Sequence, residues 1–167
     1  MTQEALLIRV LFVCTGNICR SPTAEAVFRH MVESQNLSHA IEADSCGITD
    51  FHEGEPADSR SRETAESHGF DMSGLRARRL LAIDYERFDY LLAMDGSHLR
   101  EILDRGKRLK ADLDPARACL FMDFAPHMKL RDVPDPYYGG DDGFERVLEM
   151  IEAASRGLIE TIHRDHL

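Results

Sequence analysis

The sequence predicts an α/β domain built around a mostly parallel sheet of about four strands. Apolar runs of strand length alternate along the chain with stretches whose apolar residues recur at helical spacing. A chain of 167 residues is long enough for one hydrophobic core and short for two. We therefore expect a single domain over residues 1–167.

The predicted strands cover residues 8–13, 40–45, 88–94 and 118–122. Predicted helices follow them at residues 22–31, 59–68 and 97–103. A closing amphipathic helix is indicated by apolar residues at helical spacing, namely Phe144, Val147, Leu148, Ile151, Leu158 and Ile159. The one long loop, residues 123–142, is rich in proline and glycine, and loops of this length inside compact domains are often functional.

Charge and composition exclude several classes of protein. The formal net charge of −10 argues against nonspecific nucleic-acid binding and against docking on anionic lipid. No apolar run reaches membrane-spanning length, and the start of the chain lacks the basic residues of a signal peptide. We expect a cytoplasmic protein without membrane insertion, present as a monomer or a weak homodimer.

The four cysteines stand at positions 14, 19, 46 and 119, without the spacing of a zinc site or the framework of a disulfide-stapled domain. We expect reduced thiols, no metal and no cofactor. Cys46 and Cys119 fall in or beside predicted strands and are expected in the core.

The residues most indicative of function are Cys14–Ser21, which read CTGNICRS between the first predicted strand and the first predicted helix. Gly16 and Asn17 tolerate positive φ, so the loop can curl its backbone N–H groups inward around an oxyanion, and the following helix adds its positive end. The same donors favour a thiolate at Cys14, while the Arg20 guanidinium can hold two phosphoryl oxygens. The bland alternative is a buried cysteine followed by an ordinary helix with Ser21 as N-cap.

Asp135 is the best candidate for a general acid. Pro134 and Pro136 restrict the backbone on both sides of it and would present its carboxyl group at a fixed angle. A carboxylic acid there can protonate the leaving oxygen of a phosphate ester and then activate water; the alternative is a turn-forming aspartate. Tyr137 and Tyr138 are either aromatic walls for a flat substrate ring or residues that anchor the loop, and their exposed position also permits their own phosphorylation.

The segment VLFVCTGNICRSPTAEAV at residues 10–27, together with DPYYG at residues 135–139, resembles the low-molecular-weight protein tyrosine phosphatase family. The similarity extends over nearly the whole chain. It implies a Rossmann-like single domain with a four-stranded parallel sheet, helices on both faces and a phosphate-binding loop after strand 1. It also implies metal-free hydrolysis of phosphotyrosine in proteins or peptides through a phosphocysteine intermediate.

Carried onto matching positions, the resemblance makes Cys14 the nucleophile, Arg20 the phosphate clamp and Asp135 the general acid and base. Asn17 would hold the loop through hydrogen bonds with Ser21, Ser45 and His68, and the Ser21 hydroxyl would help to stabilise the thiolate. The residues expected to contact substrate are Thr15, Gly16, Asn17, Ile18, Cys19, Phe51, Tyr137 and Tyr138.

Two positions depart from the family pattern. Phe51 stands where members usually have Trp or Tyr, so an aromatic wall is kept while peptide preference is open. The stretch from Met94 to His98 reads MDGSH where members commonly have MDxSN, and no catalytic role is assigned to His98.

Cys19 has two interpretations. The resemblance suggests a reversible Cys14–Cys19 disulfide that protects the nucleophile from peroxide, whereas the simpler interpretation is a small apolar residue packed under the loop.

Three other functions compete with phosphotyrosine hydrolysis. A protein arginine phosphatase uses a similar loop, but Ile18 stands where such members have Thr and should crowd a phosphoguanidinium. A thiol-dependent arsenate reductase needs further cysteines about seventy residues beyond the loop, and residues 47–118 contain none. A phosphate-binding module without turnover is the third alternative, although Cys14, Arg20 and Asp135 are all present.

Overall fold

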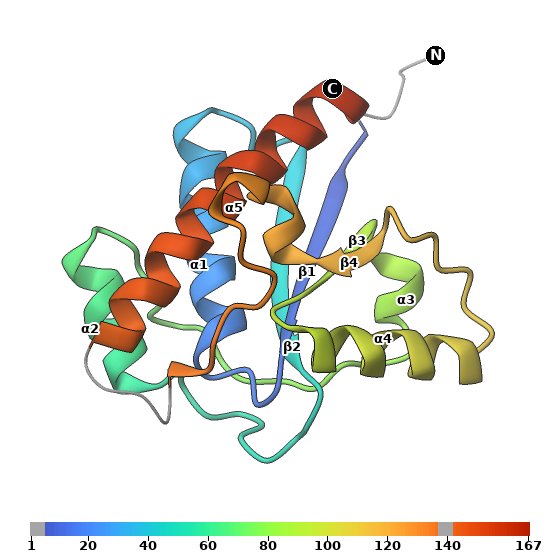
Figure 1. Cartoon of the computed structure of the whole chain (residues 1–167), viewed down its shortest axis with the longest axis horizontal. Coiled ribbons are helices and arrows are strands. Elements are labelled where there is room, and N and C mark those ends of the chain that lie inside the picture. Colours follow the sequence, from blue (N-terminus) through green and yellow to red (C-terminus); the bar gives the residue numbers. More distant parts are fainter. Residues whose placement is uncertain (1–5, 137–141) are drawn as a thin grey trace.

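The computed structural model describes residues 6–136 and 142–167, and its centre is a parallel sheet of four strands (Figure 1). The strands are β1 (Ile8–Cys14), β2 (Ile41–Gly47), β3 (Tyr90–Ala93) and β4 (Ala118–Leu120). They lie in the order β2-β1-β3-β4, and every neighbouring pair is parallel. The predicted number of strands and their direction are confirmed.

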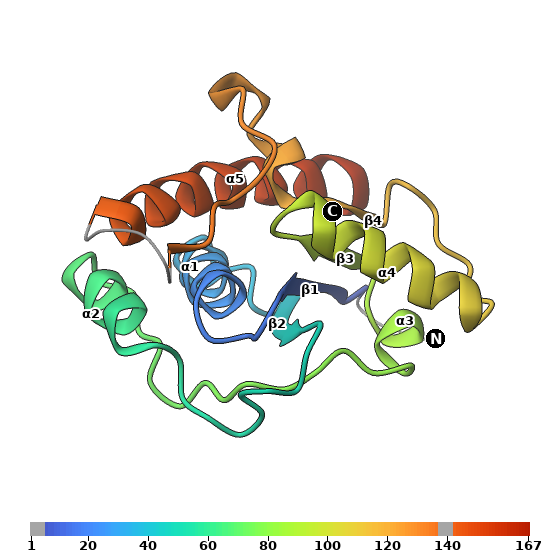
Figure 2. The same ribbon diagram turned by 60° about the horizontal axis from the view of Figure 1, so that its bottom comes forward.

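Helices cover both faces of the sheet (Figure 2). On one face lie α1 (Arg20–Ser34) and α5 (Asp142–His166), with α2 (Ser59–Ser67) packed against both. On the other face lie α3 (Asp84–Arg87) and α4 (Gly96–Arg108). Two short 3-10 turns, η1 (Phe121–Phe124) and η2 (Pro126–Met128), follow β4. This arrangement confirms the predicted Rossmann-like single domain.

The central strand β1 is apolar at nearly every position because both of its faces are covered. Val10 and Phe12 face the core under α1 and α5, while Leu11 and Val13 face α3 and α4. Cys14, two residues beyond Phe12, belongs to the first of these faces. The alternation of a strand thus directs the thiol toward the start of α1.

The topology explains where a ligand site forms. From β1 the chain passes through α1 to β2 at one side, and later returns across β1 to β3 at the other side. The carboxyl end of β1 is therefore the point at which the connections diverge to opposite faces, and ligands of open α/β sheets bind at such a point. The loop that starts at Cys14 lies there.

Several element boundaries differ from the predicted ones, and three of these differences have a physical reason in the structure. Strand β4 ends at Leu120 because the buried residues Phe121 and Met122 enter the 3-10 turn η1. Helix α4 is longer than predicted, since its apolar pattern weakens toward a basic last turn. Helix α1 begins at Arg20, so Ser21 lies inside the helix and is not the N-cap that the bland alternative gave it.

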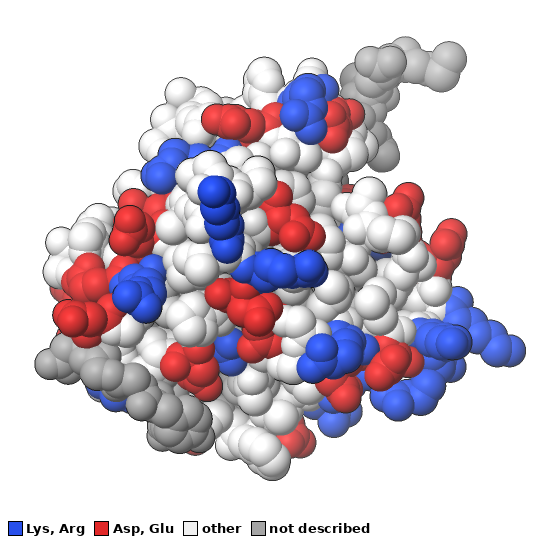
Figure 3. All heavy atoms as spheres, in the orientation of Figure 1, with Lys and Arg blue, Asp and Glu red and all other residues white. Residues whose placement is uncertain are grey.

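Acidic and basic side chains are interspersed over the face seen in Figure 3, and basic ones gather where α4 ends. Within residues 6–136 and 142–167, no helix combines the length and the apolar character that crossing a membrane requires.

Candidate active site

Three carbonyl groups along the loop from Cys14 to Ile18 accept hydrogen bonds from a neighbouring segment of the chain. The carbonyls of Cys14 and Thr15 accept hydrogen bonds from the N–H groups of Ile48 and Thr49, at 2.9 and 3.0 Å. The carbonyl of Ile18 accepts from Asp58 N–H at 2.8 Å. In a trans peptide the C=O and the following N–H point in opposite directions. The N–H groups of the next residues therefore point away from this neighbouring segment.

Those N–H groups belong to Thr15, Gly16 and Cys19, and none of them has a hydrogen-bond acceptor among the residues that the structure describes. The first turn of α1 follows directly, and its N–H groups also lack intrahelical acceptors. Unpaired backbone donors around one concavity, at the positive end of a helix, favour an anion. The geometry supports the oxyanion cradle that the sequence predicts.

Two residues allow the loop to close this tightly. Asn17 has φ of 59°, in the left-handed region that asparagine tolerates. Gly47, at the end of β2, leaves room for the loop, since a Cβ there would lie 2.8 Å from the Thr15 carbonyl oxygen. Positive φ was expected at Gly16 as well, but this residue does not adopt it. Gly16 instead provides space, because a Cβ there would lie 2.9 Å from His52 Cδ2.

The Asn17 side chain fixes the loop from within. Its Nδ2 group donates to Ser21 Oγ at 2.7 Å and to Ser45 Oγ at 3.0 Å. Its Oδ1 accepts from the backbone N–H of Arg78 at 3.0 Å. Ser45 in turn donates to the buried carboxylate of Glu25 at 2.7 Å, a residue that sequence reasoning missed. The contacts of Asn17 with both serines agree with the expectation.

The predicted contact between Asn17 and His68 is wrong. His68 follows the last residue of α2, and its Nε2 lies 2.8 Å from Glu145 Oε2 on α5. The third hydrogen-bond partner of Asn17 is the backbone N–H of Arg78. Because every residue except proline has such an N–H group, the sequence does not reveal this partner.

The Cys14 thiol lies at the base of the pocket and is 3% exposed. Its nearest polar partner is the Ser21 hydroxyl, with Sγ and Oγ 3.0 Å apart. Because Ser21 Oγ accepts from Asn17, its hydrogen is available to an acceptor, and both Cys14 Sγ and the Cys46 carbonyl, at 3.2 Å, are within reach. An ionised thiol is the stronger acceptor of the two.

Arg20 is 4% exposed and is held on its far side by Asp95, the N-cap of α4, and by Val133 in the loop between η2 and α5. Its Nη1 donates to Asp95 Oδ2 at 2.7 Å and to the Val133 carbonyl at 3.0 Å. Both hydrogens of Nη1 are thus used, which leaves the edge formed by Nε and Nη2 for an anion. Burial by itself raises the pKa of Asp95, but hydrogen bonds from Ser97 and Arg20 lower it to about 2, so this carboxylate stays charged against Arg20.

His98 is a buried member of the same cluster, which sequence reasoning did not assign. Its Nε2 lies 2.8 Å from Thr15 Oγ1 and 3.5 Å from Arg20 Nη2. Its Nδ1 accepts from the backbone N–H of Asp95 at 3.2 Å and so completes the capping box of α4. Burial, and then the Arg20 charge, lower the pKa of His98 to about 4.

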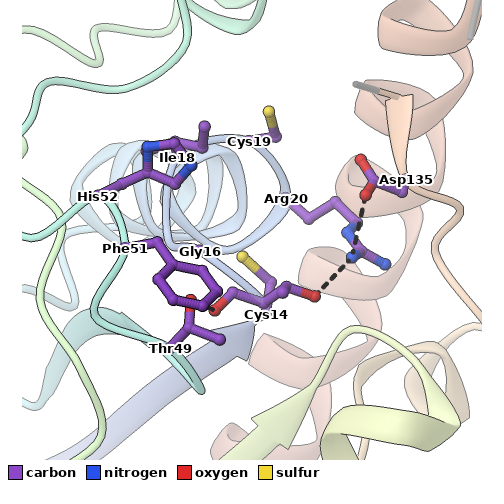
Figure 4. A pocket seen from close by; sticks show the side chains of 10 residues that line it. Cys14, Gly16, Ile18, Cys19, Arg20, Thr49, Phe51, His52 and Asp135 are labelled. Atoms are coloured by element: carbon purple, nitrogen blue, oxygen red, sulfur yellow. Dashed lines mark hydrogen bonds and ion pairs between the residues drawn. The ribbon is translucent and has the colours of Figure 1, made fainter. Parts of the chain in front are cut away.

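The entrance of the pocket is formed by residues far apart in the sequence (Figure 4). Asp135 approaches Arg20, with Oδ2 and Nη2 3.8 Å apart. The Phe51 ring is 81% exposed and stands on the opposite side of Cys14 from Asp135. The pocket has a volume of about 300 Å³, and its lining is Cys14, Thr15, Gly16, Ile18, Cys19, Arg20, Thr49, Phe51, His52 and Asp135.

The remaining predicted residues divide into three groups. Cys19 is buried, and burial followed by the Asp58 charge raises its pKa to about 12. Cys46 is fully buried and Cys119 partly so, as expected for core positions. Tyr137 and Tyr138 lie outside the described residues.

Comparison with known proteins agrees with this geometry. The family model for low molecular weight phosphotyrosine protein phosphatase matches residues 9–167. A low molecular weight protein-tyrosine-phosphatase of Streptomyces coelicolor is 47% identical over 157 residues, which are 92% of this chain and 93% of the relative. The crystal structure of YfkJ from Bacillus subtilis superimposes with a TM-score of 0.90 at 34% identity, over 99% of this chain and 100% of that one.

A third similar structure is that of a Drosophila arginine phosphatase. It superimposes with a TM-score of 0.84 at 30% identity and covers 95% of this chain and 99% of its own. The fold is therefore shared by enzymes named for different phosphorylated side chains. The chain belongs to the low molecular weight phosphotyrosine protein phosphatase family.

Proposed function

We propose that this protein hydrolyses phosphotyrosine in proteins or peptides through a phosphocysteine intermediate. The observation that supports this most strongly is the position of the Cys14 thiol, which lies at the base of a pocket lined by Arg20 and by loop residues with unpaired N–H groups. A nucleophile and an anion cradle at one point suit in-line attack on phosphorus.

In the first step the Cys14 thiolate forms an S–P bond while the bond from phosphorus to the tyrosine oxygen breaks. Arg20 and the loop N–H groups hold the charge that the three equatorial oxygens carry. Asp135 gives its proton to the departing phenolate. The contact of its carboxyl group with Arg20, at 3.8 Å, is consistent with this role, because it keeps the acid beside the anion site.

In the second step Asp135, now ionised, accepts a proton from water, whose oxygen attacks phosphorus as the S–P bond breaks. Inorganic phosphate leaves, and Cys14 returns as a thiolate. The Ser21 hydroxyl stabilises that thiolate because Asn17 donates to its oxygen, and its hydrogen turns to the charged sulfur rather than to the Cys46 carbonyl. The reaction follows ping-pong kinetics, and chelators leave its rate unchanged.

The wall residues support tyrosine over arginine as the phosphorylated side chain. Phe51 presents an exposed aromatic face at the entrance, which suits stacking on a phenyl ring. Ile18 also lines the pocket, and its branched side chain crowds the broader, polar phosphoguanidinium. Loop residues Thr15–Cys19 contact the phosphate in this assignment, and Tyr137 and Tyr138 remain candidates for a second wall.

The test compares initial rates of phosphate release from matched phosphotyrosine and phosphoarginine peptides, with reduced protein and excess chelator. Fast release from the phosphotyrosine peptide alone supports the assignment. Preference for phosphoarginine keeps the chemistry and rejects the substrate, whereas tight phosphate binding without release identifies a binding module. An I18T variant sharpens the comparison, since relief of crowding should raise the relative rate on phosphoarginine.

A cytoplasmic location and a monomer or weak dimer are part of this proposal, as is redox protection of the nucleophile. Peroxide would convert the Cys14 thiolate to a sulfenic acid, which Cys19 would then attack, with loss of water, to form a disulfide. Figure 4 shows the Cys19 sulfur pointing away from Cys14, so the loop must rearrange first. Mass spectrometry after mild peroxide tests this: a sulfinic acid at Cys14 without a 14–19 linkage contradicts protection.

A further inference from the structure

His98 occupies an unusual place for a residue at the start of a helix. It stands at the third position of α4, and its Nδ1 closes the capping box with the backbone N–H of Asp95. Its other nitrogen, Nε2, reaches away from the helix toward the loop after β1. The ring thus connects Asp95, just after β3, to Thr15 at the base of the pocket, and the His98 side chain is 3% exposed.

The hydrogen bond from the Asp95 N–H to Nδ1, at 3.2 Å, favours one tautomer of the ring over the other, in which Nδ1 would donate to Asp95 Oδ1 at 3.3 Å. Nδ1 accepts a hydrogen bond, so in the neutral ring the hydrogen is on Nε2. Nε2 then donates to Thr15 Oγ1 at 2.8 Å. Arg20 Nη2 lies 3.5 Å from the same nitrogen, and two groups that both carry hydrogen do not bond each other. The guanidinium edge is therefore bounded by the ring on this side.

The surrounding charges keep the ring in this state. Arg20 disfavours a second positive charge, and Asp95, Asp132 and Asp135 favour one, but burial and Arg20 outweigh the three carboxylates. The ring is neutral across the ordinary working range of pH.

The consequence for Thr15 concerns the direction of its hydroxyl group. Its oxygen accepts from His98 Nε2 and, at 3.4 Å, from Arg20 Nη2. With both lone pairs engaged, the hydroxyl hydrogen is left for a third group, and Thr15 lines the pocket.

We propose that His98 is a positioning residue for the anion site: through Nε2 it orients the Thr15 hydroxyl as a donor and bounds the Arg20 guanidinium, so that both face a bound phosphoryl group. This inference rests on the proposed function, since it assigns Arg20 and the loop to the phosphoryl group. His98 itself does not touch the reacting atoms.

Two substitutions separate this role from helix capping. In H98N the amide oxygen takes the place of Nδ1 and keeps the cap, while nothing reaches Thr15. In H98Q the amide nitrogen takes the place of Nε2 and keeps the bond to Thr15, whether or not the amide oxygen still accepts from the Asp95 N–H. Vanadate and inorganic phosphate serve as probes of the anion site, with aryl phosphate hydrolysis and Tm measured beside them.

We expect H98N to raise the inhibition constants of vanadate and phosphate about tenfold, with little change in Tm. A tenfold increase corresponds to the loss of one hydrogen bond from the Thr15 hydroxyl to the charged anion. H98Q should stay within about threefold of the wild type. In a T15V background H98N should cost less than about threefold, because its main partner is already absent. Equal inhibition constants for H98N and wild type, or equal losses in H98N and H98Q, overturn the inference.

A second test uses the wild-type protein and so does not depend on whether a variant folds. Nitrogen NMR of the His98 ring between pH 5 and 7 should show the neutral Nε2–H tautomer, and a ring protonated at Nδ1 contradicts the proposal. Failure of the proposed function looks different, because wild-type protein would then neither release phosphate from aryl phosphates nor bind vanadate.

Discussion

The floor and the rim of the pocket are built in opposite ways. On the floor, Cys14 and Arg20 are 3% and 4% exposed, and each has neighbours fixed by hydrogen bonds. On the rim, Phe51 is 81% exposed and the Asp135 side chain is 38% exposed. A buried, connected floor fixes the chemistry, whereas an exposed rim is free to vary with the substrate.

The largest effect is expected on the floor. C14S replaces the thiolate by a hydroxyl that is a far weaker nucleophile in the same place, so kcat for aryl phosphates should fall by at least about 10⁴-fold. Vanadate binding should survive, since the loop and Arg20 remain. Substantial turnover in a C14S protein whose mass has been verified would show that the floor does not supply the nucleophile.

The rim substitution with the largest effect is D135A, because it removes the proton donor and leaves the floor intact. We expect a loss of about 10²- to 10³-fold on phosphotyrosine, whose phenolate needs a proton, and a smaller loss on p-nitrophenyl phosphate, whose leaving group does not. The ratio of the two losses is the measurement. A loss that is equal for both substrates would assign Asp135 to binding rather than to proton transfer.

The difference in pH-dependent stability between the wild type and H98N reports on the floor. Burial and Arg20 lower the pKa of His98 from 6.5 to about 4, so between these values the unfolded chain binds the proton more readily than the folded one. His98 therefore lowers stability as pH falls from 6.5 to 4, by up to about 3 kcal/mol. Asp95, with its pKa near 2, loses its stabilising charge only at lower pH, below this window.

Urea unfolding of wild type and H98N across this range measures that contribution. The stability of the wild type relative to H98N should fall as the pH is lowered. The matched control is H39N at an exposed histidine, which should run parallel to the wild type. If the free energy of unfolding changed with pH in the same way for wild type and H98N, the folded protein would not disfavour the protonated His98 ring.

The smallest effect is expected from the rim wall. F51A removes the exposed aromatic face that we propose as a wall for the substrate ring, so KM for phosphotyrosine peptides should rise about five- to tenfold. The inhibition constant of inorganic phosphate should stay unchanged, because phosphate does not reach the wall. I83A, at another exposed apolar residue, serves as the control. An equal rise in the inhibition constant of phosphate would mean that Phe51 acts on the anion site rather than on the substrate ring.

Sequence patterns predicted most of the fold because they are local. The apolar run of β1 and the spacing of Phe144, Val147 and Leu148 in α5 each follow from a periodicity within one segment. The end of β4 was missed because Phe121 and Met122 are apolar in either state, and only tertiary packing turns them into a 3-10 helix.

The site was predictable where one motif carries it and not where distant residues meet. Cys14 and Arg20 lie six positions apart in one motif and were assigned from it, whereas the contacts of Asn17 with Ser21 and Ser45 were expected from the family resemblance. His68 was misassigned because a backbone amide of Arg78 takes its place. The roles of His98 and Glu25 depend on contacts between separate elements, which no local pattern encodes.

In this mechanism the Cys14 thiol carries the phosphoryl group between the two steps. Partitioning of that group between water and an added alcohol tests it most directly. With several aryl phosphates of different leaving groups, we expect one constant ratio of alkyl phosphate to inorganic phosphate, because every substrate gives the same phosphocysteine. A ratio that changes with the leaving group would mean that water attacks the substrate itself, and would contradict this mechanism.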